Sequence, residues 1–190
     1  MADERDDRLA PGFLVAPPPL GDPNFDRSVV LLAVNEPGGS MGFVVNRSSD
    51  IMLHTLLKEL DMDPQVADRS VLIGGPVSGF SGFVLYEHPE AQPLAPGIEI
   101  SAHISVSPSR ELLEAAARGD LPGRFELLLG YAGWAPEQLE DELTRGSWLH
   151  APFDAELLFD VHLDQRWDEA YARLGITPFG FMNVPGGAQA

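Results

Sequence analysis

The stretch RSVVLLAV, residues 27–34, requires a β-strand that is covered on both faces. Uninterrupted apolar runs rich in β-branched residues occur in strands that other elements bury from two sides. NEPGGS at 35–40 supplies turn residues, and MGFVVNR at 41–47 follows as a hairpin partner. A chain built on this hairpin must supply a further layer of structure on each side of it.

Other periodic segments supply those layers. Further strands are predicted at 12–17, 71–75, 82–87, 98–107 and 124–134. The segment 98–107 alternates apolar and polar residues, as one half-buried strand does. Helices are predicted at 53–60, 108–118, 136–145, 154–159 and 164–174. Strands occur partly as hairpins and partly in alternation with helices, which favours an α+β fold with a mixed sheet and flanking helices.

The chain has 190 residues, a length that suits a single domain. Residues 1–10 are strongly charged and are expected to form a flexible N-terminal arm. The domain is expected at 11–177, and a Gly/Pro-rich tail at 178–190. The charged N-terminus is not expected to act as a secretory signal, and no apolar run reaches the roughly 20 residues that a membrane helix requires. A cytoplasmic location and no membrane association are therefore expected.

Charge and composition exclude several classes of function. Twelve basic residues stand against 29 acidic ones, for a formal net charge of −17. Nucleic-acid phosphates repel such a surface, so direct nucleic-acid binding is disfavoured. The chain has no cysteine, which excludes disulfides, thiolate nucleophiles and cysteine-ligated metal sites.

No motif in the sequence assigns a reaction. The Gly-rich stretch GGPVSGFSG at 74–82 lacks the Lys–Ser/Thr pair of a phosphate loop, so it is interpreted as a turn between strands. DVHLD at 160–164 could present Asp160, His162 and Asp164 to a metal. The interpretation adopted is that Asp164 caps the last helix. The sequence therefore predicts no catalytic residue, no metal site and no cofactor.

The stretch GYAGWAPEQLEDEL, residues 130–143, places two aromatic residues ahead of a helix with four carboxylates. A helix N-terminus favours negative charge by about 0.3–1 kcal/mol per group, so these acids are interpreted as a solvated surface. Two interpretations of Tyr131 and Trp134 stay open. They close a ligand cleft, or they plug the core with their polar tips bonded to the backbone.

Six segments carry a family resemblance: PPPLGDPNFDRSVVLL (17–32), GFVVNR (42–47), GGPV (74–77), SVSPSRELLEA (105–115), LGYAGWAPEQLEDEL (129–143) and WL (148–149). In this order they resemble the AlgH/YqgE family of bacterial proteins. The resemblance implies an α+β fold whose mixed sheet bends into a partly closed barrel with helices outside. One branch of that family carries a transcriptional-regulator label, without a DNA-binding motif or an established enzymatic activity. Asn35 departs from the family pattern, in which His is frequent.

Polar residues that match the family suggest a ligand cleft. Its candidate members are Arg27, Asn46, Arg47, Tyr131, Trp134 and Gln138. If the fold brings the two arginines and Asn46 to face Trp134, guanidinium, amide and indole groups could bind a carboxylate or phosphate. In the alternative, Arg27 pairs with Asp22 or Asp26 in a buried structural network.

The function predicted from the sequence is a non-enzymatic binding or regulatory module. Its partner is expected to be a small anionic ligand or another protein. The first alternative is a hydrolase or transferase that uses Glu140 or Asp141 near Trp134. The second is a transcriptional regulator that acts indirectly, without binding DNA itself.

Overall fold

The computed structural model describes residues 8–18 and 25–176. The strands are β1 (Gly12–Val15), β2 (Val29–Glu36), β3 (Gly39–Val44), β4 (Ser48–Met52), β5 (Ser70–Ile73), β6 (Val77–Glu87), β7 (Ile98–Ser101), β8 (Ile104–Ser107), β9 (Phe125–Trp134) and β10 (Leu149–Pro152). The helices are α1 (Leu53–Glu59), α2 (Arg110–Arg118), α3 (Gln138–Thr144), α4 (Ala155–Phe159), the 3₁₀ turn η1 (Leu163–Gln165) and α5 (Arg166–Arg173).

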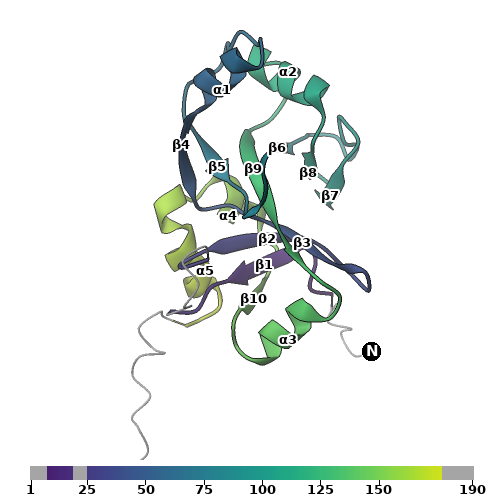
Figure 1. The fold of residues 1–190 in the computed structure, drawn as a ribbon, viewed down its shortest axis with the longest axis vertical. Coiled ribbons are helices and arrows are strands. Elements are labelled where there is room, and N and C mark those ends of the chain that lie inside the picture. The colour runs from purple at the N-terminus through teal and green to yellow at the C-terminus, as the bar shows by residue number, and fades with distance from the viewer. Residues whose placement is uncertain (1–7, 19–24, 177–190) are drawn as a thin grey trace, which may run out of the picture.

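The strands form one curled, partly barrel-like sheet (Figure 1). Its main order is β10-β1-β2-β3-β9-β6-β8-β7, and β4 joins through β5, which also pairs with β9. Neighbouring strands are antiparallel except for β5 and β9, which are parallel, so the sheet is mixed. The α+β class, the mixed barrel-like sheet and the single domain predicted from the sequence are confirmed.

Strand β9 connects the two halves of the sheet. Its first half pairs with β6, whereas Ala132, Gly133 and Trp134 pair with β3. Between these halves, Gly130 has a φ of +73°, and a Cβ atom there would lie 2.5 Å from the carbonyl oxygen of Gly75. Only glycine fits this close approach and left-handed backbone. The kink lets one strand serve both halves of the barrel.

Strand β2 is buried on both faces, as its sequence predicts. Val29 and Leu31 pack in the cluster that holds Trp167 of α5. Val30 and Leu32 pack on the opposite face, in the cluster that holds Trp134. Helices α4 and α5 therefore cover one face of the lower half of the sheet and α3 the other, while α1 and α2 lie over the upper half (Figure 1).

The prediction of a single strand over 98–107 is wrong. The segment forms the antiparallel pair β7 and β8, in which Ile98 lies opposite Val106 and Ser101 opposite Ile104. A two-residue turn preserves the alternation of apolar and polar residues, so a hairpin and one long strand look alike in sequence. The Gly-rich stretch 74–82 also differs from expectation, since residues 77–82 belong to β6 and Phe80 is exposed to solvent there.

Folded structure begins within the predicted N-terminal arm. Leu9 and Ala10 pack against the cluster around Trp134. The Leu9 carbonyl oxygen lies 2.8 Å from Nε2 of His150 on β10. Residues 1–7 of the arm and the predicted tail at 178–190 lie outside the described residues.

Candidate functional site

Three of the predicted site residues line one pocket. Arg27, Asn46 and Arg47 border a hollow of about 220 Å³, together with Trp167 of α5. Arg27 comes from the turn before β2, and the other two follow β3, so the β2–β3 hairpin brings them together. Asp26, Asp164 and Asp168 also line this hollow, which we call the Arg27 pocket.

Asn46 fixes the backbone of the Arg27 pocket. Its Nδ2 donates to the carbonyl oxygen of Arg27 at 2.8 Å, and its Oδ1 accepts from the backbone N–H of Val29, also at 2.8 Å. These bonds hold Arg27 at a φ of +50°, a left-handed conformation that costs a non-glycine residue about 1–2 kcal/mol. Strain of this kind, maintained by a dedicated side chain, is typical of functional sites.

The Arg27 guanidinium lies 5.1 Å from the centre of the Trp167 ring. It forms no ion pair with any carboxylate in the described part of the chain. The alternative in which Arg27 pairs with Asp26 in a buried network is therefore not formed. Asp22, the other partner named in that alternative, lies outside the described residues. Arg47 donates from Nη2 to the Asp26 carbonyl oxygen at 3.2 Å, which fixes one edge of its guanidinium beside the turn.

The other predicted residues lie elsewhere, so the expectation of a single cleft is wrong. Trp134 and Gln138 line a separate pocket of about 420 Å³ beneath α3. Tyr131 packs edge-on against Phe83 in the core, with ring centres 6.1 Å apart. Trp134 lies opposite Ser40 at the start of β3, whereas Asn46 follows the end of β3. Ser40 and Asn46 are six residues apart along an extended strand, which corresponds to about 20 Å.

Trp134 is a core plug, the second of the two interpretations that the sequence left open. It is 7% exposed, and its indole Nε1 donates to Oε2 of Glu142 at 2.9 Å. Trp148 Nε1 donates to the same oxygen at 2.9 Å, and Gln138 Nε2 donates to the other at 2.9 Å. One carboxylate of α3 thus accepts from two tryptophans. Their indole N–H groups are bonded to a side chain and not, as that interpretation expects, to the backbone.

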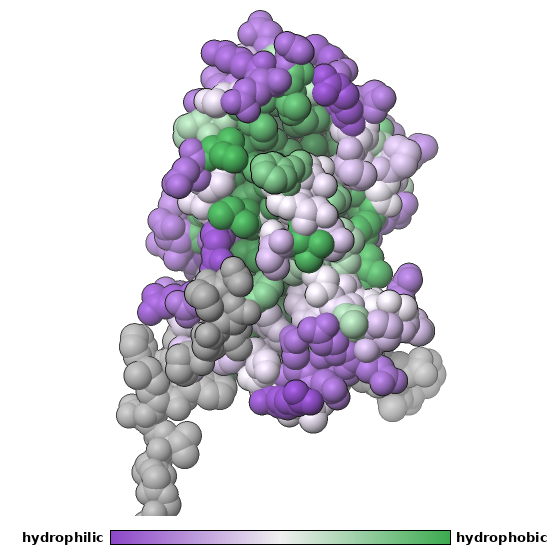
Figure 2. Space-filling model, in the orientation of Figure 1, coloured by the Kyte–Doolittle hydropathy of each residue, from purple (hydrophilic) through white to green (hydrophobic). Residues whose placement is uncertain are grey.

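The remaining acids of α3 show no sign of acid–base chemistry. A hydrogen bond from Asn35 holds the pKa of the exposed Glu140 carboxyl below its usual value. Asp141 is 70% exposed and lies 3.6 Å from Arg145. Figure 2 shows hydrophilic residues gathered over α3. Neither carboxylate is desolvated, as a general acid working near neutral pH would need to be.

Comparison with known proteins places these features in a family. A family model described as AlgH-like matches residues 13–179. The chain belongs to the AlgH-like family. A UPF0301 protein from Anaeromyxobacter dehalogenans strain 2CP-1 is 44% identical over 189 residues, with 96% of each chain covered. A UPF0301 protein from Xanthomonas campestris pv. campestris strain B100 is 40% identical, with 95% of this chain and 96% of that one covered.

Solved structures agree with this assignment. The solution structure of the AlgH protein from Pseudomonas aeruginosa matches with a TM-score of 0.76 and 34% identity, over 99% of this chain and 100% of that one. A crystal structure of a protein from Corynebacterium diphtheriae has the same fold, with a TM-score of 0.68 and 22% identity over 90% of each chain. The resemblance to AlgH inferred from sequence is confirmed.

Two further findings concern the described part of this AlgH-like chain. None of its helices is long and apolar enough to cross a membrane. Within residues 8–18 and 25–176, no group of three His, Asp or Glu side chains is placed to hold a metal ion. Asp160, His162 and Asp164 do not converge on one point, and His162 rather than Asp164 caps the turn that precedes α5.

Sequence reasoning missed two arginines that line a larger pocket of about 610 Å³. Arg69 precedes β5, and Arg166 is the first residue of α5. Arg166 is only 4% exposed and donates to the carbonyl oxygens of Val45, Leu158 and Val161. Nothing local marks it in the sequence, because an arginine that opens an amphipathic helix normally faces solvent. Burial lowers its pKa, although it stays charged at neutral pH.

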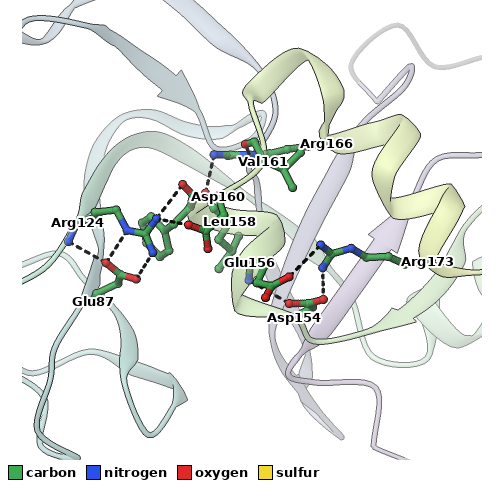
Figure 3. Close-up of polar contacts among 10 residues, drawn as sticks. Glu87, Arg124, Asp154, Glu156, Leu158, Asp160, Val161, Arg166 and Arg173 are labelled. Carbon is green, nitrogen blue, oxygen red and sulfur yellow. Dashed lines mark hydrogen bonds and ion pairs between the residues drawn. The ribbon is translucent and has the colours of Figure 1, made fainter.

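An ion-paired cluster beside this pocket makes the stability of the fold depend on pH. Figure 3 shows Arg124 between Glu87 and Asp160. Its Nη2 lies 2.8 Å from Glu87 and its Nη1 2.6 Å from Asp160. Hydrogen bonds from Arg124 hold the pKa of the Glu87 carboxyl below its usual value. Glu87 therefore stabilises the fold above its unfolded-state pKa of about 4.3, and this contribution is lost as pH falls through the folded-state pKa.

We expect Glu87→Gln to lower the free energy of unfolding by roughly 1 kcal/mol at pH 7, and by progressively less from pH 5 to pH 3. Urea unfolding at pH 7, 5, 4 and 3 measures this difference between variant and wild type. Glu90→Gln is the matched control, since Glu90 is exposed and its carboxylate forms no ion pair within the described residues. A difference that stays constant with pH would contradict the assignment.

Proposed function

We propose that this AlgH-like chain is a non-enzymatic, cytoplasmic binding module whose ligand is a small anion held in the Arg27 pocket. The observation that carries the proposal is the strained Arg27, held by Asn46 beside Arg47, with a guanidinium that pairs with no carboxylate of the described residues. An exposed guanidinium that lacks a carboxylate partner can bind a carboxylate or phosphate in a bidentate manner. Asn46 is a positioning residue in this proposal, because both of its polar groups are bonded to the turn.

The three aspartates on the rim set a limit on the ligand. Asp26, Asp164 and Asp168 would repel a large polyanion, and the chain carries a net charge of −17. A pocket of about 220 Å³ also accommodates only a small molecule or the anionic end of a larger one. The proposed ligand is therefore a compact carboxylate or phosphate, and direct DNA binding is not part of the proposal.

The hydrolase or transferase alternative draws no support from α3, because Glu140 and Asp141 are both solvated. A regulatory outcome would follow from ligand binding rather than from chemistry. Turn 25–28 and η1 both border the Arg27 pocket, so an anion bound there would bridge two surface segments. A protein partner that reads these segments would then distinguish the bound from the free state.

A thermal-shift screen with pyrophosphate, citrate and succinate tests the proposal. A ligand at 100 times its dissociation constant adds about 2.7 kcal/mol, which raises the melting temperature of a domain of this size by about 5–11 °C. We expect such a shift in the wild type, and a much smaller one in Arg27→Gln. The substitution is conservative for the fold, because stacking on the Trp167 ring is the one interaction of the Arg27 guanidinium with a described residue.

Arg118→Gln is the control for a general loss of positive charge. Arg118 is 57% exposed, pairs only with Asp120 among the described residues, and does not line the Arg27 pocket. It should keep the full shift. Equal loss of the shift in both variants, or unchanged melting curves with every anion tested, would refute the proposed function.

A further inference from the structure

The 610 Å³ pocket lies across η1 from the Arg27 pocket, and its walls come from β4, β5, β9 and α5. Leu163 and Asp164 line both hollows. The residues that line the larger one include Arg69, Arg166, Ser48 and Ser70. We call this hollow the Arg69 pocket. Its cations come from segments that are distant in sequence, so the fold itself concentrates them there.

Arg69 is fixed on two sides and available on a third. Its Nε lies 3.4 Å from Oε2 of Glu126, and its Nη2 donates to the Phe125 carbonyl oxygen. Its guanidinium also stacks on the Phe125 ring, 4.5 Å from the ring centre. No described residue accepts a hydrogen bond from Nη1. The side chain is therefore preorganised, with one donor nitrogen left for a ligand.

Arg166 is a buried cation with too little negative charge near it. It forms no ion pair with a carboxylate of the described residues, and its hydrogen-bond partners among them are three neutral carbonyl groups. A guanidinium has five N–H groups, so Nη1 and Nη2 each keep one after these bonds are made. Glu126 is the carboxylate that acts on it electrostatically, and Glu126 is already paired with Arg69. Two guanidiniums thus share one carboxylate.

The other acids on the wall do not correct this imbalance. Asp160 is held 2.6 Å from Nη1 of Arg124, which lies outside the pocket lining. Asp164 is 87% exposed at the rim, so water screens its charge. Among the described residues, the Ser70 hydroxyl donates only to Met52 Sδ, at 3.9 Å, a weak bond that an oxyanion would replace.

We infer that the Arg69 pocket is a second, independent site for an oxyanion group, either carboxylate or phosphate. The oxyanion lies between Arg69 and Arg166 and accepts from the hydroxyls of Ser48 and Ser70. Glu126 is the internal competitor of the ligand, because it occupies the edge of Arg69 that would otherwise complete a bidentate contact. The site therefore binds weakly until an anion displaces the Glu126 carboxylate or shares Arg69 with it.

This arrangement predicts opposite effects for two neighbouring substitutions. Inorganic phosphate and citrate are titrated separately into the full chain, and backbone amide shifts are followed by ¹H–¹⁵N NMR. Saturable shifts are expected at residues 48, 70 and 126. Glu126→Gln should tighten binding about fivefold, since it removes the competing charge, and Arg69→Gln should weaken it about tenfold. A response to only one of the two probes would identify the site as a phosphate or a carboxylate site.

Two controls separate this site from other effects. Arg27→Gln should leave the shifts at 48, 70 and 126 unchanged, which distinguishes this site from the Arg27 pocket. Arg118→Gln should also leave them unchanged. If Arg69→Gln does not fold, the anion affinity of Arg69→Lys and the tighter binding expected in Glu126→Gln still test the inference. No saturable shifts in the wild type and in Glu126→Gln, or weakening in Arg118→Gln equal to that in Arg69→Gln, would overturn the inference.

Discussion

Replacing Arg166 with methionine is expected to lower the free energy of unfolding by about 3–4 kcal/mol. Three carbonyl oxygens, of Val45, Leu158 and Val161, lose a charged donor at once. Each charge-assisted hydrogen bond contributes about 1.5–3 kcal/mol, and relief from burying a cation offsets part of that sum. Methionine keeps most of the aliphatic volume, so the effect measured is mainly that of the lost donors.

The positions of the three carbonyl groups explain why one side chain is expected to have so large an effect on stability. Val45 follows β3, Leu158 belongs to α4, and Val161 lies between α4 and η1. Arg166 thus ties the C-terminal helices to the barrel over 121 residues of sequence. Figure 3 shows α4 also held through Asp154 and Glu156, which pair with Arg173 of α5. Those pairs are exposed and contribute less.

Urea unfolding, monitored by far-ultraviolet circular dichroism, measures the effect of Arg166→Met. Arg118→Met is the matched control and should change the unfolding free energy by no more than about 0.5 kcal/mol, because Arg118 is largely exposed. Arg166→Lys should fall between the two, since one ammonium group does not reach three carbonyls. A loss below about 1 kcal/mol in Arg166→Met would show that Arg166 does not hold the helices to the barrel.

The features that sequence predicts well are those set by local pattern. The apolar run at 27–34 specifies a strand buried on both faces whatever its neighbours are, and the turn after it specifies the hairpin to β3. That hairpin alone brings Arg27 and Asn46 together, so half of the candidate cleft could be predicted. The hairpin of β7 and β8 was missed because its short turn does not interrupt the alternation of side chains.

Features that depend on distant pairing escaped prediction. The hypothesis of one cleft requires Trp134 to face Arg27, but the register of β9 against β3 places Trp134 opposite Ser40, on the other face of the sheet. The kink of β9 at Gly130 reverses the alternation of inward-facing and outward-facing side chains along the strand. That kink depends on the close approach of Gly75 to Gly130. Arg166 escaped for the same reason, since its acceptors lie on segments that only the folded sheet brings near.

Replacing Glu142 with alanine is expected to cost about 2–3 kcal/mol of unfolding free energy. The indole N–H groups of Trp134 and Trp148 both donate to its Oε2 at 2.9 Å, and these residues are 7% and 4% exposed. A buried donor left without an acceptor costs about 1–3 kcal/mol. The 420 Å³ pocket beside the pair admits water, which reduces the cost below the sum of two such losses.

Asp141→Ala is the matched control for Glu142→Ala, because it removes one carboxylate from the same helix at a position that is 70% exposed. It should change stability by no more than about 0.5 kcal/mol. Glu142→Gln should recover about half of the loss, since an amide oxygen accepts from the indoles without the help of a charge. Unfolding in urea gives the free energies, and tryptophan emission reports the changed indole environment. Equal stability of Glu142→Ala and Asp141→Ala would mean that packing alone holds the two tryptophans and that the bonds to Glu142 add nothing to stability.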